Sequence, residues 1–96
     1  MRKQFKKTIM DIALHDERIV MLLGDVSVYL FKDFNDRYPN RFFNMGICEN
    51  TLISVAAGLS SQGLVPFVHT IAPFVTERSF EQIKLDMCYN KFGGNI

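Results

Sequence analysis

Apolar residues recur along the chain with two different spacings, and each spacing predicts a different kind of element. In residues 3–15 they repeat at helical intervals with charged residues between them, which predicts an amphipathic helix. Residues 19–23 form an unbroken apolar run that stops at Gly24. Such a run is typical of a strand buried on both faces, as in a parallel sheet. A polar, aromatic linker is expected to follow it.

The same pattern continues through the rest of the chain. Residues 41–46 predict a second short strand that ends at a glycine. Small and apolar residues dominate residues 49–62 and predict a buried helix, which Gly63 is expected to end with a positive φ angle. Residues 64–71 predict a third strand, and the segment from Val75 onward predicts a third amphipathic helix.

The order of these elements indicates the fold class. Helix, strand, strand, helix, strand and helix follow one another, and strands separated by helices pair in parallel through right-handed crossovers. We therefore expect an α/β fold, specifically part of a three-layer α/β/α parallel sheet. The chain holds at most one domain. Asn95 and Ile96 resemble the start of another strand, so residues 1–96 are expected to be the amino-terminal part of a domain truncated within itself.

Composition narrows the classes of function. With 48% hydrophobic and 22% charged residues and a net charge of +1, the chain has no strong field for nucleic acid or an anionic membrane. The longest apolar stretch, residues 52–59, is far shorter than the roughly 20 residues that a membrane span requires. The basic amino terminus lacks the apolar segment of a secretory signal. We therefore expect a cytoplasmic location.

Several common kinds of site have no sequence signal here. Cys48 and Cys88 lie far apart without a CxxC motif, so neither a disulfide framework nor a zinc site is predicted, and no metal ligand is assigned. Neither His15 nor His69 has a nucleophile at a suggestive spacing, and both are interpreted as structural. The glycine-rich motifs that cradle phosphates are missing.

Three residues follow the ends of the predicted strands. Ligands of open parallel sheets bind beyond the carboxyl ends of the strands. Asp25, Glu49 and Phe74 would meet there, so two acids and an aromatic ring could line one edge of the sheet. Each also has a structural interpretation. Glu49 could simply stabilise a helix dipole, Asp25 could cap the next segment, and Phe74 could belong to the core.

Ordered motifs over nearly the whole chain carry a family resemblance. They are RFFNMGICEN at residues 41–50, AAGL at 56–59, GLVPF at 63–67 and FVTERSFEQI at 74–83. This set resembles the pyrimidine-binding domain of the transketolase family, whose pattern runs RF-x-N-x-GI-x-EQ, AAGLA, a PF-containing strand and F-x-x-x-R-x-x-DQI. Asn50 departs from the family's glutamine, which alters the support around the glutamate without touching its carboxylate.

The resemblance implies a cofactor, thiamin diphosphate, and roles for four residues. Glu49 takes the position of the glutamate that shares a proton with N1′ of the aminopyrimidine ring. Phe74 takes the position of the aromatic residue that stacks on that ring, and Asp25 and Val26 match the segment near the thiazolium. The diphosphate and its Mg²⁺ would be held by a partner chain or missing domain, because the family's domain for them has no counterpart here.

The function implied is that of a subunit or fragment of a transketolase-like enzyme, which transfers a two-carbon ketol unit between sugar phosphates. We expect a dimer or an α2β2-type assembly with a diphosphate-binding subunit, and an isolated chain that is inactive. Enzymes of the 1-deoxyxylulose-5-phosphate synthase type or the 2-oxoacid dehydrogenase β-subunit type are alternatives. So is a non-catalytic module that keeps the fold only to bind a partner.

Overall fold

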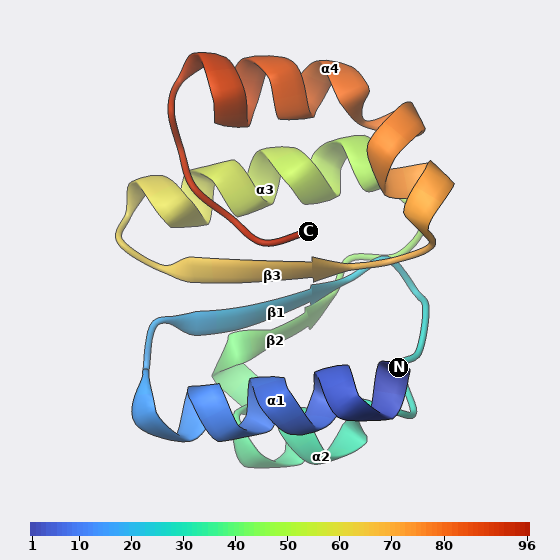
Figure 1. Cartoon of the computed structure of the whole chain (residues 1–96), viewed down its shortest axis with the longest axis vertical. Coiled ribbons are helices and arrows are strands. Elements are labelled where there is room, and N and C mark those ends of the chain that lie inside the picture. The colour runs from blue at the N-terminus through green and yellow to red at the C-terminus, as the bar shows by residue number, and fades with distance from the viewer.

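The computed structural model describes residues 1–96 and has three parallel strands between two layers of helices (Figure 1). The strands are β1 (Ile19–Leu23), β2 (Phe42–Asn44) and β3 (Val65–His69), and their order in the sheet is β2-β1-β3. Both pairings of β1 are parallel. Helices cover each face of the sheet, which confirms the predicted three-layer α/β/α class.

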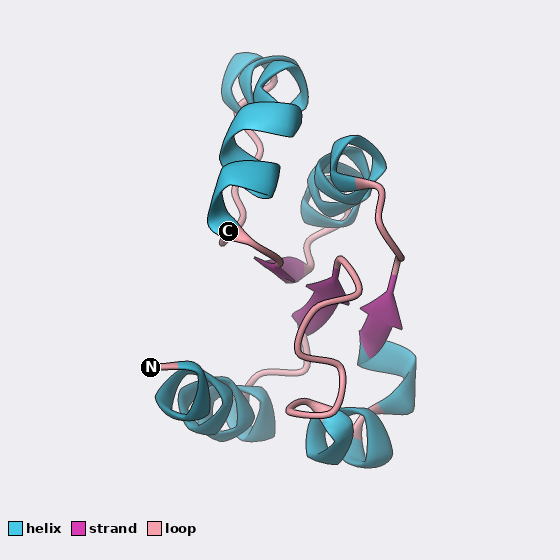
Figure 2. Ribbon diagram, turned by 90° about the vertical axis from the view of Figure 1, so that its right-hand side faces the viewer, coloured by secondary structure: helices cyan, strands magenta, loops and turns pink.

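One helical layer is formed by α1 (Arg2–His15) and α2 (Lys32–Arg37), and a short 3₁₀ turn at Pro39–Arg41 leads from it into β2 (Figure 2). The other layer is formed by α3 (Glu49–Ser61) and a final helical segment. That final segment consists of the π-helical turns η2 (Phe74–Arg78) and η3 (Ile83–Tyr89), with the short α4 (Phe80–Gln82) between them. None of the helices combines the length and the apolar character that a membrane crossing needs.

The central strand divides the core in two. All five residues of β1 are buried, as expected for a strand between two helical layers. Val20 and Leu22 pack with α3 and the final helical segment, whereas Ile19, Met21 and Leu23 pack with α1 and α2. Alternate side chains of one strand therefore join both helical layers to the sheet.

The structure confirms the predicted helices and strands and corrects two features. The segment after β1, for which a polar, aromatic linker is expected, contains α2, which is anchored by the buried Phe34 and by the buried Phe31 at its N-cap position. Six residues are too few to show a helical period. The predicted amphipathic helix from Val75 onward is present from Phe74, but most of it has π-helical hydrogen bonding. Gly63 has φ +89°, as predicted for the residue that ends α3.

Asn95 forms an isolated parallel bridge to β3. Its N–H donates to Pro66 O at 3.0 Å, and Val68 N–H donates to Asn95 O at 2.7 Å. This pairing fits the expected start of a further strand. That the domain is truncated at this point stays a prediction.

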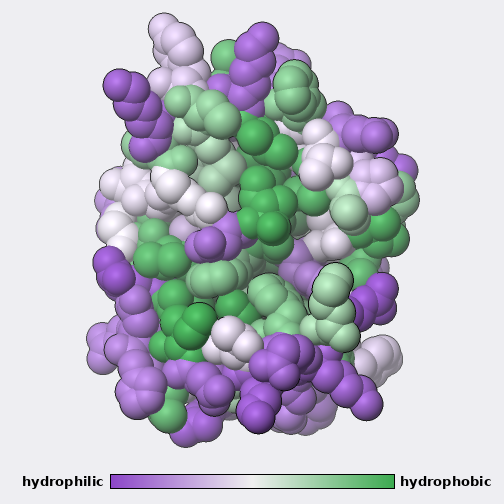
Figure 3. Space-filling view, viewed as in Figure 1, coloured by the Kyte–Doolittle hydropathy of each residue, from purple (hydrophilic) through white to green (hydrophobic).

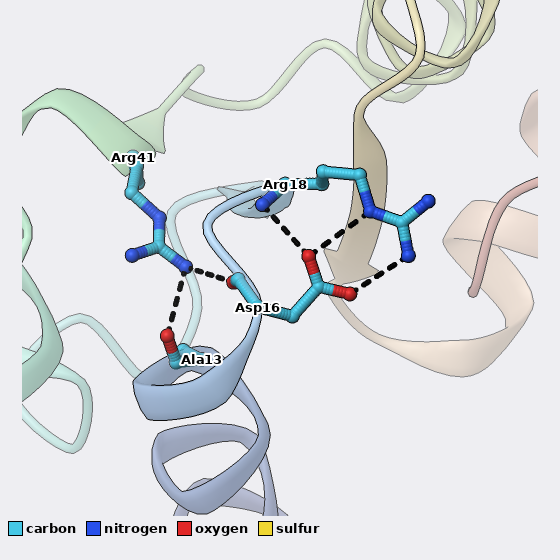
Figure 4. Close-up of polar contacts among 4 residues, drawn as sticks. All are labelled: Ala13, Asp16, Arg18 and Arg41. Carbon is cyan, nitrogen blue, oxygen red and sulfur yellow. Dashed lines mark hydrogen bonds and ion pairs between the residues drawn. The ribbon is translucent and has the colours of Figure 1, made fainter.

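Arg41 joins three elements at the amino-terminal edge of the sheet (Figure 4). Its Nε donates to Ile19 O at 2.8 Å, and one terminal nitrogen donates to Ala13 O at 3.2 Å and to Asp16 O at 2.7 Å. The guanidinium thus binds carbonyls at the end of α1 and the start of β1. The Asp16 carboxylate instead pairs with Arg18, whose hydrogen bonds lower the pKa of Asp16 to about 2.

We predict that Arg41→Lys lowers the free energy of unfolding by about 2–4 kcal/mol, because an ammonium cannot reproduce the planar fork and leaves carbonyls without a donor. Urea unfolding followed by circular dichroism would measure the loss. Arg37→Lys is the matched control, because Arg37 is exposed. Equal stability of the two variants would contradict the prediction.

Candidate functional site

The carboxyl ends of all three strands meet at one edge of the sheet. Leu23, Asn44 and His69 end the strands, and parallel register brings Leu23 opposite both of the others. Gly24 follows β1, and a Cβ on it would lie 3.0 Å from Thr70 Oγ1, so a side chain there would crowd the neighbouring strand end. The predicted convergence of strand ends is therefore present.

Glu49 is the first residue of α3 and is buried, with 5% of its surface exposed. The loop before it is held to the sheet by Met45 N–H, which donates to Leu23 O at 2.8 Å, and it turns at Gly46, where φ is +79°. The carboxylate thus lies at a helix amino terminus, where the dipole favours negative charge. No side chain or backbone group of the chain donates a hydrogen bond to it, and its nearest cation is Arg78.

Arg78 connects Glu49 to Phe74. Its guanidinium carbon lies 3.6 Å from the centre of the Phe74 ring, and one terminal nitrogen lies 3.7 Å from Glu49 Oε1. Phe74 is half-buried, and the Arg78 side chain is 51% exposed. A buried carboxylate and an aromatic ring therefore face the same flat cation.

Asp25 has a different partner. Its backbone N–H donates to Asn44 Oδ1 at 2.9 Å, and Asn44 Nδ2 donates to Asp25 Oδ1 at 3.0 Å. Asn44 Oδ1 also accepts from Gly46 N–H at 3.2 Å, so one amide links the ends of β1 and β2. The structure therefore brings Glu49 and Phe74 together through Arg78, while Asp25 is exposed and bound to Asn44.

A cavity of about 580 Å³ opens beside this edge, on the β3 side of the molecule, and neither Glu49 nor Phe74 lines it. The side chains that line it include Val26, Arg2, His69 and Val75. Figure 3 views that side and shows apolar residues gathered in a band between the two helical layers. No cluster of three or more histidine, cysteine or acidic side chains is arranged to hold a metal ion.

Comparison with known proteins agrees with this arrangement. The family model of the transketolase pyrimidine binding domain matches residues 1–95. The chain belongs to this family. The resemblance that the motifs indicated is thereby confirmed.

Relatives of this pyrimidine-binding domain include three kinds of protein. An uncharacterized 33.6 kDa protein in the fasciation locus of Rhodococcoides fascians is 44% identical over 87 residues, which are 90% of this chain and 28% of that protein. The 6-deoxy-6-sulfo-D-fructose transketolase subunit SqwH of Clostridium sp. is 32% identical over 93% of the chain and 28% of the subunit. A 1-deoxy-D-xylulose-5-phosphate synthase of Nitratidesulfovibrio vulgaris is 39% identical over 91% of the chain and 14% of the enzyme.

A solved structure has the same fold. It is described as a split gene transketolase, inactive beta4 tetramer, and it superposes with a TM-score of 0.87 at 40% sequence identity, covering 97% of this chain and 31% of that one. The pyrimidine-binding domain described here thus spans less than a third of each of these relatives.

Sequence reasoning did not assign a site role to two residues of this pyrimidine-binding domain. They are Arg78, which lies over Phe74, and Asn44, which holds Asp25. Both stand in the quoted motifs, as the arginine of F-x-x-x-R and the asparagine of RF-x-N, so a signal was present. Their partners could not be read from it, because a motif does not specify side-chain contacts.

His69 packs between aromatic rings rather than toward Glu49. Its ring lies 5.5 Å from that of Phe5 and 5.4 Å from that of Phe31, and its Nε2 is 3.3 Å from Ser27 Oγ. Burial, together with the positive charge of Arg2, lowers the pKa of His69. This packing fits the structural role that the sequence suggested.

We predict that the neutral form of His69 contributes a pH-dependent part of the stability. Its folded pKa is lower than the unfolded value of about 6.5, so the contribution is complete above that pH and declines as the pH falls below it. Urea unfolding at about pH 7.5 and pH 5 should show the wild type losing stability. His69→Gln should lose less, whereas the control His15→Gln, at the exposed end of α1, should behave like the wild type. An unchanged loss in His69→Gln would refute the assignment.

Proposed function

We propose that this chain supplies the pyrimidine-binding side of a thiamin-diphosphate site, in a transketolase-type enzyme that transfers a two-carbon ketol unit between sugar phosphates. The observation that supports this most is the state of Glu49. Its carboxylate is buried at the start of a helix and accepts no hydrogen bond from the chain. Arg78, which neighbours this carboxylate, also lies over the ring of Phe74. A carboxylate in that state is suited to share a proton with a ligand.

The residues present fit the aminopyrimidine part of the cofactor. Thiamin diphosphate, when bound, supplies the nucleophilic carbon for forming and breaking bonds next to a carbonyl. Glu49 would hold a proton between its carboxyl oxygen and the ring nitrogen N1′, which burial favours because the low local dielectric strengthens the interaction. Phe74 would offer one face of its ring for stacking.

Asp25 and Val26 are proposed to lie on the thiazolium side of the same cofactor. What supports this is the left-handed turn after β1, where Asp25 has φ 58°, because ligands of open parallel sheets bind beyond the carboxyl ends of the strands. The hydrogen bond that Asn44 Nδ2 donates to Asp25 Oδ1 would fix the direction of the Asp25 carboxylate, and the bond that the Asp25 backbone N–H donates to Asn44 Oδ1 would hold the turn.

The other half of the site is proposed to come from a partner. The diphosphate and its Mg²⁺ require several oxygen ligands and backbone amide donors, which usually come from a glycine-rich loop and a helix amino terminus. This chain has no such loop. The relatives that support an assembly are described as a transketolase subunit and as a split gene transketolase tetramer. We therefore propose a dimer or an α2β2-type assembly with a diphosphate-binding subunit.

One alternative reaction is favoured by a specific observation. The synthase of Nitratidesulfovibrio vulgaris is 39% identical, which is no lower than the identity to the transketolase subunit. A 1-deoxyxylulose-5-phosphate synthase-type reaction would use the same glutamate. Product analysis of the assembled enzyme, with pyruvate or a ketose phosphate as the donor, would separate the two reactions.

We predict that Glu49→Gln in the assembled enzyme lowers turnover by about 10²–10⁴-fold, because an amide of the same shape cannot share the proton. Steady-state kinetics would measure the loss, and circular dichroism would show that the fold is kept. Glu17→Gln is the control, since Glu17 is exposed in the turn before β1. Turnover near that of the wild type would remove Glu49 from the mechanism and would favour the non-catalytic, partner-binding module.

We also predict that the chain alone binds no measurable thiamin diphosphate and gains affinity only with a diphosphate-binding partner. The carboxylate and the ring would contact only the aminopyrimidine, which is a small part of the ligand. Calorimetry with the cofactor and Mg²⁺, first on the chain and then with the partner added, would test this. Micromolar binding by the chain alone would show that the diphosphate site is misplaced.

A further inference from the structure

The guanidinium of Arg78 occupies a position with two features at once. At 3.6 Å from the ring centre it covers one face of Phe74, and at 3.7 Å it neighbours the Glu49 carboxylate. A guanidinium is flat and delocalised, and it carries N–H groups along its edge. The guanidinium thus offers a flat face for stacking to Phe74 and an N–H edge to Glu49. A protonated aminopyrimidine ring would offer the same two groups.

Glu49 explains why a cation is held there. Only 6% of its side chain is exposed, and no other cation lies within 4 Å of its carboxylate. A buried carboxylate without a partner is strongly disfavoured, so a compensating charge stabilises the chain whenever no ligand is present. Arg78 supplies that charge from a side chain about half of which is in water, so its guanidinium can move away into solvent.

We propose that Arg78 is a place-holder for the aminopyrimidine ring, and that cofactor binding displaces it from Phe74 and Glu49. This inference rests on the function proposed above. The displacement needs only a change of side-chain rotamer, because the guanidinium is at the end of a long, half-exposed side chain. Cofactor binding is then a competition in which the chain's own arginine must first be released.

If Arg78 competes with the cofactor, removing this arginine should strengthen the binding of thiamin diphosphate rather than weaken it. In the assembled enzyme, Arg78→Ala should raise the affinity for thiamin diphosphate about three- to tenfold, the size expected for one exposed ion pair and one cation–π contact. Arg78→Lys keeps the charge but not the plane, and its affinity should fall between the two. Titration calorimetry with the cofactor and Mg²⁺ measures the change.

Three further measurements separate this effect from a general one. Arg37 also lies over an aromatic ring, 5.8 Å from the centre of Tyr38, but on the opposite helical layer, so Arg37→Ala should leave cofactor affinity unchanged. The cofactor-free assembly carrying Arg78→Ala should melt at a lower temperature than the wild type, because Glu49 then lacks its partner. In a Glu49→Gln background the gain in affinity from Arg78→Ala should shrink, because one of the two released contacts is already missing.

The outcomes distinguish this inference from the proposed function. If the wild-type assembly binds no thiamin diphosphate, both are wrong. If the wild type binds it and Arg78→Ala binds equally or more weakly, the place-holder is overturned while the pyrimidine site stands, and Arg78 would then contact the cofactor directly. If Arg78→Ala does not fold, the comparison of Arg78→Lys with the wild type decides, and an affinity no higher than that of the wild type overturns the inference.

Discussion

Parallel pairing of β1 with a strand on each side determines where the loops of this domain lie. Because all three strands run the same way, their carboxyl ends lie at one edge, and every loop that leaves the sheet there enters a single region. The opposite edge is fixed by Arg41, whose guanidinium binds carbonyls of α1 and β1. Anchoring one edge in this way leaves the loops of the other edge available for chemistry.

The chemistry proposed for that edge depends on withdrawing one carboxylate from water. Glu49 starts α3, so the helix dipole offsets part of the penalty for burying its charge, and Arg78 offsets another part. Neither the backbone N–H groups at the start of α3 nor Arg78 donates a hydrogen bond to the Glu49 carboxylate. A carboxylate stabilised by charge alone keeps its oxygens free for a ligand, whereas a fully hydrogen-bonded one would be a structural acid. This difference favours a functional Glu49 over the helix-capping interpretation.

How much of this could be predicted from the sequence depends on the range of the interactions. The buried run of β1, the helix of α3 and its stop at Gly63 follow from local patterns, and all are present. The helix α2 was missed because its stability comes from packing Phe31 and Phe34 into the core, not from periodicity. The convergence of strand ends followed from topology. The contacts of Arg78 and Asn44 could not be predicted, because side-chain conformations are decided by neighbours distant in sequence.

The charge balance of the chain explains why its site is proposed to be shared. At the candidate site the Glu49 carboxylate and the Arg78 guanidinium already compensate each other. This ion pair leaves no positive charge of its own for a diphosphate, and the net charge of the whole chain is only +1. A neutral aromatic ring can replace Arg78 at this site without upsetting that balance, because a proton shared with Glu49 takes over the compensation. A diphosphate would add negative charge that this ion pair does not meet, which supports the proposal that a partner supplies the groups that bind it.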